Sequence, residues 1–242
     1  MKYLYREDYF CEIDTEEKAY VLGLLMADGS IFGNRLTLQL SGEDGEMVER
    51  VKNLLCLSKK TLDLITYKNP KYQNAHKLTI VNRRIADSLK NLGVVERKSV
   101  LLKEPKDLDS SLVRHLIRGY FDGDGHLGWW YYKQSKKEEK GKGSLKANFE
   151  ITSTKNFCLW LKSEFYNIGV NSFLIKNRGK SYSLRISGNQ QIEKSLDFIY
   201  NNSNIHLNRK FQKYREFKNL RIVKKIRERD SNGRFTTIPT GD

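Results

Sequence analysis

Two aspartates in matched surroundings are the residues of this chain whose types and spacing could support chemistry. Asp28 lies near the end of the stretch VLGLLMADG at 21–29, and Asp124 lies near the end of IRGYFDGDG at 117–125. Both stretches are apolar enough for helices, so each carboxylate would lie at a helix C-terminus, where the helix dipole is already negative. Two carboxylates about 5.5 Å apart would repel by about 3 kcal/mol, and an oxygen-bound divalent cation would remove that conflict. The matched pair predicts a shared metal site, whereas one copy alone would suggest only a core helix ending in a solvated Asp-Gly turn.

The helices that carry these aspartates need a close packing partner. Each stretch has small residues four positions apart: Gly23 with Ala27, and Gly119 with Gly123. This spacing places them on one helix face, where two helix backbones can approach closely. Gly29 and Gly125 follow the aspartates, and we expect them to end the helices with a positive φ. Asp14 and Glu17 resemble a capping box that begins the first helix.

The two stretches resemble the LAGLIDADG motif of homing endonucleases. The last acidic residue, which binds metal in that family, is present in both copies as Asp28 and Asp124. The motif departs from the family pattern at Met26, Arg118 and Tyr120. Two motifs in one chain are similar to the single-chain, pseudo-symmetric members, and the resemblance covers roughly residues 10 to 215.

This resemblance implies the ligands and the cofactor of the site. Mg²⁺ would bind Asp28 and Asp124, with the carbonyls of Ala27 and Gly123 as further ligands, and Mn²⁺ or Ca²⁺ would occupy the same site. A basic residue after the last helix of each repeat would meet the scissile phosphate, which points to Lys98 and Lys210. The simpler interpretation of these lysines is two exposed basic pairs in a lysine-rich protein. Asp122 has Met26 as its counterpart, and we expect it on the side of the helix; the alternative is that it assists the metal site.

The chain predicts two α-β-β-α-β-β-α repeats in a mixed α/β fold, with helices on one face of each antiparallel sheet. We expect the first repeat at 1–104, the second at 105–206, and a basic C-terminal helix and tail at 207–242. The expected helices are 14–27, 44–56, 83–91, 111–123, 155–168 and 190–200. The expected strands are 30–32, 35–41, 62–66, 77–81, 128–132, 146–152, 172–177 and 181–187. A mobile loop is expected at 133–144.

Alternating strands predict a polar sheet face that could read DNA. Polar side chains alternate with buried leucines at 35–41 and with Ala147, Phe149 and Ile151 in the second half. Such side chains match base edges in the major groove, which admits a β-ribbon, although an ordinary solvated sheet face has the same pattern. The expected DNA contacts are Arg35, Thr37, Gln39, Ser41, Lys77, Thr79, Lys146, Asn148, Glu150, Thr152, Arg185 and Ser187. From the basic C-terminal segment we add Arg209 and Lys213 as phosphate contacts. Trp129 and Trp130 are adjacent, so they face opposite sides and at least one should lie in the core.

Composition favours a polyanionic partner. The 242 residues carry a net charge of +15 and a pI of about 9.6, which is typical of nucleic-acid binding. Three widely spaced cysteines indicate reduced thiols, and we expect an intracellular protein without a secretion signal or membrane span.

We therefore expect a monomeric, Mg²⁺-dependent, site-specific endonuclease, intron-encoded or free-standing. Its partner would be double-stranded DNA with a long asymmetric target, cut in both strands to leave short 3′ overhangs. Two alternatives use the same fold: an RNA maturase that binds intron RNA, and a non-catalytic DNA-binding regulator.

Overall fold

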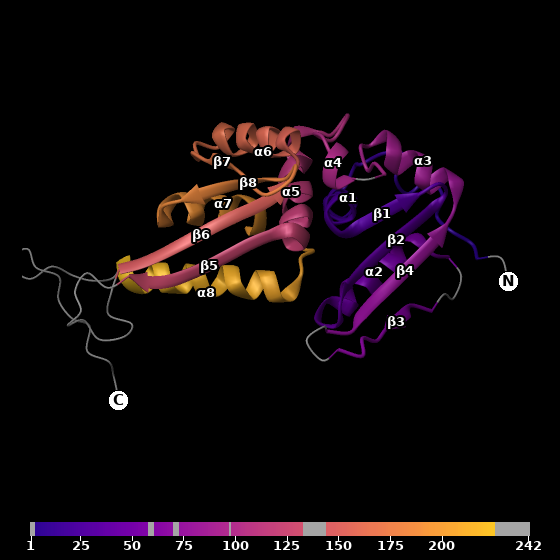
Figure 1. Ribbon diagram of the computed structural model, residues 1–242, viewed down its shortest axis with the longest axis horizontal. Helices are drawn as coiled ribbons and strands as arrows, with labels where there is room; N and C mark the ends of the chain where they lie inside the picture. The colour runs from indigo at the N-terminus through magenta and orange to yellow at the C-terminus, as the bar shows by residue number, and fades with distance from the viewer. Residues whose placement is uncertain (1–2, 58–60, 70–72, 97, 133–143, 226–242) are drawn as a thin grey trace, which may run out of the picture.

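The chain folds into two four-stranded antiparallel sheets that lie on either side of a central helix pair (Figure 1). The computed structural model describes residues 3–57, 61–69, 73–96, 98–132 and 144–225. Of the loop expected at 133–144, residues 133–143 lie outside these ranges and Ser144 already belongs to a strand. The C-terminal tail at 226–242 also lies outside them.

Both repeats have the predicted order of elements. The first contains α1 (Glu16–Asp28), β1 (Gly29–Phe32), β2 (Arg35–Ser41), η1 (Gly42–Asp44), α2 (Gly45–Leu55), β3 (Asp63–Ile65), β4 (Ala75–Val81) and α3 (Arg83–Asn91). The second contains α5 (Ser110–Asp124), β5 (Gly125–Tyr132), β6 (Ser144–Ser153), α6 (Lys155–Asn167), β7 (Phe173–Lys176), β8 (Tyr182–Ser187) and α7 (Asn189–Tyr200). A short helix α4 (Lys98–Leu101), which the sequence analysis missed, precedes the second repeat. The predicted basic C-terminal helix is α8 (Asn208–Lys225).

The two sheets share one topology, which confirms the predicted fold class. The strand orders are β1-β2-β4-β3 and β5-β6-β8-β7, so each sheet places its repeat's second and fourth strands at the centre. Opposite residues share a face, and the pairs Leu38 with Leu78 and Ile151 with Leu184 lie on the buried faces. Helices α2 and α3 contact the first sheet, whereas α6 and α7 contact the second. The opposite face of each sheet is left for solvent or a partner.

Helix α8 extends the covered face of the second sheet. It lies beside β5 (Figure 1) and packs against α7 and β5. Phe217 is fully buried and its ring lies 6.1 Å from that of Trp129. Trp129 is therefore the partly buried member of the tryptophan pair, and Trp130 is 52% exposed. Among the described helices, none is long and apolar enough to cross a membrane.

Two local predictions were wrong. Helix α1 is capped by Thr15, whose hydroxyl accepts from the Lys18 amide at 3.3 Å, while Asp14 forms an ion pair with the Lys18 ammonium at 2.8 Å. Gly29 and Gly125 have φ of −73° and −85°, so neither adopts the expected left-handed conformation. Glycine is needed there for space, because a Cβ at Gly29 would lie 2.6 Å from the Leu25 carbonyl oxygen. In each repeat the backbone therefore passes from the helix directly into an extended strand.

Candidate active site between α1 and α5

Four small residues let α1 and α5 pack backbone against backbone. A Cβ on Gly23 would fall 2.9 Å from the Leu116 carbonyl carbon and from the Tyr120 amide nitrogen of α5. A Cβ on Gly119 would fall 2.9 Å from the Leu24 amide nitrogen of α1. We call this contact, made by Gly23, Ala27, Gly119 and Gly123, the helix seam. The predicted small-residue faces are confirmed as the contact between the two repeats.

The helix seam brings the two aspartates together at its end. A Cβ on Gly123 would lie 2.5 Å from both the Ala27 Cβ and Asp28 Oδ2, so the Asp28 carboxylate reaches the backbone of α5 next to Asp124. Burial, and then the charge of Asp124, raise the pKa of Asp28 from 3.8 to about 6. Burial also raises the pKa of Asp124, against the opposing effect of the Lys98 cation. Two partly desolvated carboxylates with raised pKa values form a site that a cation would stabilise.

Both predicted lysines reach this end of the helices. The Lys98 ammonium donates to the Ala27 carbonyl oxygen, and the Lys210 ammonium donates to the Gly125 carbonyl oxygen. Burial lowers the pKa of Lys98, although the charges of Asp124 and Asp28 act against this. Burial and then Arg209 lower the pKa of Lys210 to about 8. Lys210 is only 8% exposed and Lys98 is half-buried, so neither is an ordinary surface lysine.

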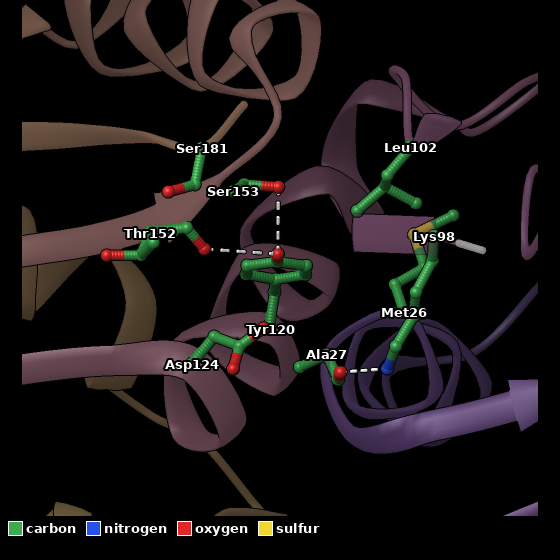
Figure 2. A pocket seen from close by; sticks show the side chains of 9 residues that line it. All are labelled: Met26, Ala27, Lys98, Leu102, Tyr120, Asp124, Thr152, Ser153 and Ser181. Atoms are coloured by element: carbon green, nitrogen blue, oxygen red, sulfur yellow. Dashed lines mark hydrogen bonds between the residues drawn. The ribbon is translucent and has the colours of Figure 1, made fainter. Parts of the chain in front are cut away.

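A cavity of about 300 Å³ opens beside Asp124 (Figure 2). Its lining comes from both repeats and consists of Met26, Ala27, Lys98, Leu102, Tyr120, Asp124, Thr152, Ser153 and Ser181. The Tyr120 hydroxyl donates to Ser153 Oγ at 2.9 Å and to the Thr152 carbonyl at 3.3 Å. Tyr120, one of the departures from the family pattern, thereby forms a polar wall of this cavity.

The oxygen donors of the site suit a hard divalent cation. Asp28, Asp124 and nearby carbonyls are the ligand types that Mg²⁺ and Ca²⁺ prefer. Burial and the charge of Asp124 raise the pKa of Asp28, so its ionised form would gain from a bound cation. Across the described ranges no three His, Cys, Asp or Glu side chains gather as a metal cluster. The Ala27 carbonyl is already bound by Lys98, so cation binding there requires that lysine to move. The two carboxylates have the ligand chemistry that such a cation prefers.

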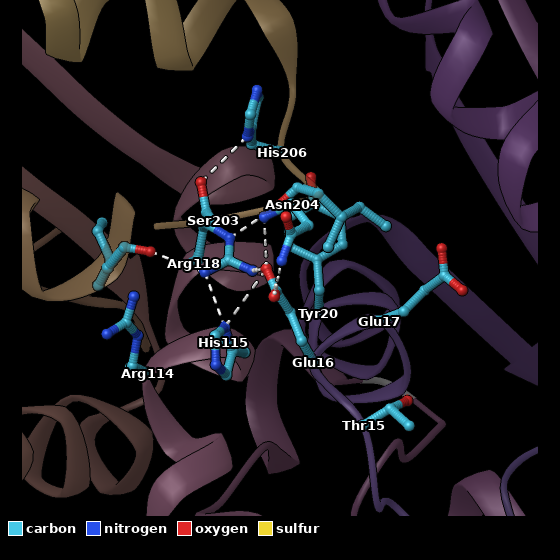
Figure 3. Close-up of polar contacts among 12 residues, drawn as sticks. Thr15, Glu16, Glu17, Tyr20, Arg114, His115, Arg118, Ser203, Asn204 and His206 are labelled. Carbon is cyan, nitrogen blue, oxygen red and sulfur yellow. Dashed lines mark hydrogen bonds and ion pairs between the residues drawn. The ribbon is translucent and has the colours of Figure 1, made fainter. Parts of the chain in front are cut away.

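The sequence analysis missed a buried ion network next to the helix seam (Figure 3). Arg118 is fully buried and donates to Glu16 at 2.6 Å and to the carbonyls of Ile199 and Ile205, both at 2.8 Å. Glu16 also accepts from the backbone and the side chain of Asn204. This network ties the start of α1 to α5 and to the segment between α7 and α8.

Asp122, which we expected only on the side of the helix, lies on the inward side of α5 and is fully buried. Its carboxylate accepts from the Tyr20 hydroxyl and the Leu207 amide, both at 2.7 Å, and from the Tyr200 hydroxyl. It does not line the cavity beside Asp124. The only hint in the sequence was its mismatch with Met26.

The DNA contacts predicted on strands lie on the sheet faces away from the helices. In the first sheet Arg35, Thr37, Gln39 and Ser41 pair with Val81, Thr79, Lys77 and Ala75. In the second, Asn148, Glu150 and Thr152 pair with Ser187, Arg185 and Ser183, and Lys146 pairs with the exposed Trp130.

Some of these side chains already have partners. Arg185 donates to Glu150 at 2.7 Å, and Gln39 donates to the Tyr67 hydroxyl at 3.1 Å. Arg209 donates to both carboxylate oxygens of Asp44 in the first repeat, so it links the repeats. Lys213 is exposed on α8.

Two antiparallel sheets around a glycine-packed helix pair, with one aspartate ending each helix, define the LAGLIDADG fold. The chain has the fold of single-chain LAGLIDADG homing endonucleases.

Solved structures with this fold cover nearly the whole chain. I-SmaMI bound to uncleaveable DNA has a TM-score of 0.58 and 14% identity, over 88% of this chain and 91% of its own. I-AabMI bound to uncleaved DNA has a TM-score of 0.58 and 14% identity, over 85% and 90%. I-LtrWI bound to target DNA has a TM-score of 0.57 and 14% identity, over 94% and 95%. At this identity the likeness establishes the fold.

Comparison of the sequence with known proteins does not place the chain in a family. No family model matches the chain. The DNA-directed RNA polymerase subunit Rpo1C of Methanocaldococcus jannaschii is 27% identical over 142 residues, which is 56% of this chain. The match spans only 16% of that subunit.

Proposed function

We propose that this protein is a site-specific DNA endonuclease that hydrolyses one phosphodiester bond in each strand of a duplex. The observation that carries the proposal is the meeting of Asp28 and Asp124 at the end of the helix seam, between two sheets with polar outer faces. Solved proteins of this fold are described as meganucleases or homing endonucleases and are bound to DNA.

In this proposal the aspartates bind the metal and the lysines contact the phosphate. Asp28 and Asp124 would hold Mg²⁺, or Mn²⁺ or Ca²⁺ in the same site, and one protein of this fold was solved with calcium ions. A bound divalent ion would supply an activated water and neutralise charge at the phosphate. Lys98 and Lys210 would stabilise the phosphate as charge develops on its oxygens. Ala27 and Gly123 would offer backbone carbonyls to the metal.

The sheets would hold the duplex over the helix seam. Arg35, Lys77, Lys146 and Arg185 would face the groove, while Lys213 and Arg209 would contact phosphates. Because the contacting residues differ between the sheets, the target would be long and asymmetric. We propose that the protein acts inside the cell as a monomer, since one chain supplies both aspartates, and that an intron or a free-standing gene encodes it.

Cleavage of a randomised duplex library tests this function. With Mg²⁺ the protein should enrich cut sites with a stagger, and Asp28→Asn and Asp124→Asn should abolish double-strand cleavage. Lys162→Ala, on the outer surface of α6, is the matched control and should leave cutting unchanged. Tight duplex binding without a cut under any divalent ion would refute the endonuclease, and preference for a structured intron RNA would then favour the maturase.

A further inference from the structure

The second repeat holds its lysine through a buried carboxylate that has no counterpart among the described residues of the first repeat. Asp122 and Asp124 lie two residues apart on α5. Asp124 ends the helix at the cavity, whereas Asp122 turns inward and is fully buried. A buried carboxylate is costly unless donors satisfy it, and three donors converge on this one: the hydroxyls of Tyr20 and Tyr200 and the amide of Leu207.

The bond to Leu207 matters because Leu207 is the residue directly before α8. Its carbonyl accepts from the amides of Lys210 and Phe211, both at 3.0 Å. Asp122 thus fixes the amide of the residue whose carbonyl closes the first turn of the helix. Helix termini have unsatisfied groups and fray unless side chains bind them.

Lys210 stands on that first turn. Its ammonium donates to the Gly125 carbonyl and lies 5.3 Å from the centre of the Phe121 ring. Its side chain is buried, so its position depends on the backbone from which it extends. A continuous set of contacts therefore runs from Asp122 through Leu207 to Lys210 and back to Gly125, the residue after Asp124.

The first repeat places its lysine differently. Met26 takes the position of Asp122 and is fully buried. Lys98 begins α4, a helix of only four residues, and its ammonium donates to the Ala27 carbonyl. We propose that Asp122 is a positioning residue that sets Lys210 at the second half-site, so that the two strands of the target depend on different supports. This inference rests on the proposed endonuclease function.

The test replaces Asp122 with the residue that the first repeat carries. In Asp122→Met the amide of Leu207 loses its acceptor, whereas Asp122→Asn keeps one oxygen for it. Tyr20→Phe is the matched control, because it removes a donor from the same carboxylate and leaves Leu207 bound. Each variant is compared on a duplex labelled on either strand, with Lys210→Met and Lys98→Met identifying which lysine serves which strand.

Asp122→Met should slow the Lys210-dependent strand about 10- to 100-fold, as displacement of a catalytic group by about 1 Å does, and nicked DNA should accumulate. The other strand, and both strands in Asp122→Asn and Tyr20→Phe, should be cut within about threefold of the wild-type rate. Equal slowing of both strands in Asp122→Met, or selective slowing in Tyr20→Phe, would overturn the proposal.

A second measurement does not need cleavage. The acetylation rate of Lys210, followed by mass spectrometry on the folded protein, should rise about tenfold in Asp122→Met if the first turn of α8 opens locally. The rate at Lys98 should stay constant. Unchanged labelling of Lys210 would refute the positioning role even if the wild-type protein cut no DNA, whereas increased labelling without cleavage would locate the failure in the endonuclease assignment.

Discussion

The helix seam gives the sharpest quantitative prediction. A Cβ on Gly23 would approach the Leu116 carbonyl oxygen about 1 Å closer than real Cβ atoms come to any heavy atom, and a Cβ on Gly119 would do the same to the Tyr20 carbonyl oxygen. Both obstacles are backbone atoms, so no side-chain rotation relieves them. Gly23→Ala or Gly119→Ala must therefore push α1 and α5 apart by about 1 Å.

The expected change in the free energy of unfolding combines two opposing effects. Overpacking a close contact costs about 3 kcal/mol at the upper end of the usual range, and replacing a helical glycine with alanine returns about 1 kcal/mol. Each variant should lose about 2 kcal/mol of unfolding free energy, which lowers the melting temperature by about 4–8 °C in a chain of this size. The double variant should lose less than the two single losses combined, since one displacement relieves both contacts.

Calorimetry and strand cleavage together check this prediction. Asn219→Ala, at an exposed position of α8, is the control for helix propensity and should be neutral or slightly stabilising. Cleavage should fall about 100-fold in the seam variants, because the aspartates move apart by about 1 Å. Unchanged melting temperatures, or strictly additive losses in the double variant, would show that the seam is not close-packed.

The remaining predictions concern the buried network, the metal site and the DNA face. Glu16→Gln should lose about 3 kcal/mol in urea unfolding, because it leaves the fully buried Arg118 cation uncompensated; Glu17→Gln, whose partner is an exposed arginine, should lose less than about 1 kcal/mol. The pKa of Asp28 is raised from 3.8 to about 6, so the folded protein favours the protonated carboxyl. This adds to the free energy of unfolding below about pH 4, and up to about 3 kcal/mol is lost as the pH rises through 6. Without metal, Asp28→Asn should therefore melt above the wild type near pH 8 and with it near pH 4; equal melting near pH 8 would contradict the buried charge. Lys213→Ala should reduce the salt dependence of duplex binding by about 0.9 in log–log slope, and an unchanged slope would remove Lys213 from the phosphate contacts.

Much of this fold could be predicted from sequence because its determinants are local. The strict alternation at 35–41 places three leucines on one face, and the structure buries all three. Helix α3 has the predicted bounds, since Asn82 caps it through the Ile85 amide. The repeated spacing of small residues predicts the close contact between α1 and α5 from sequence alone.

What could not be predicted depends on contacts between distant segments. Asp122 receives donors from residues 78 to 102 positions away, and nothing near it in sequence indicates them. Arg118 departs from the family pattern in a position that packs against Glu16, so its meaning appears only when the repeats meet. Gly29 is the residue type expected at a helix end, but the reason for glycine differs from the predicted one. A side chain there would collide with Leu25, and the φ of Gly29 is not positive.

The first two strands of the second sheet are longer than those of the first sheet, and this has a consequence for reach along a duplex. Strand β5 has 8 residues where β1 has 4, and β6 has 10 where β2 has 7. Four extra strand residues add about 13 Å, and a base pair rises about 3.4 Å. The longer arm would cover up to about four more base pairs than the shorter one, so the footprint on DNA would be off-centre from the cut by about two base pairs.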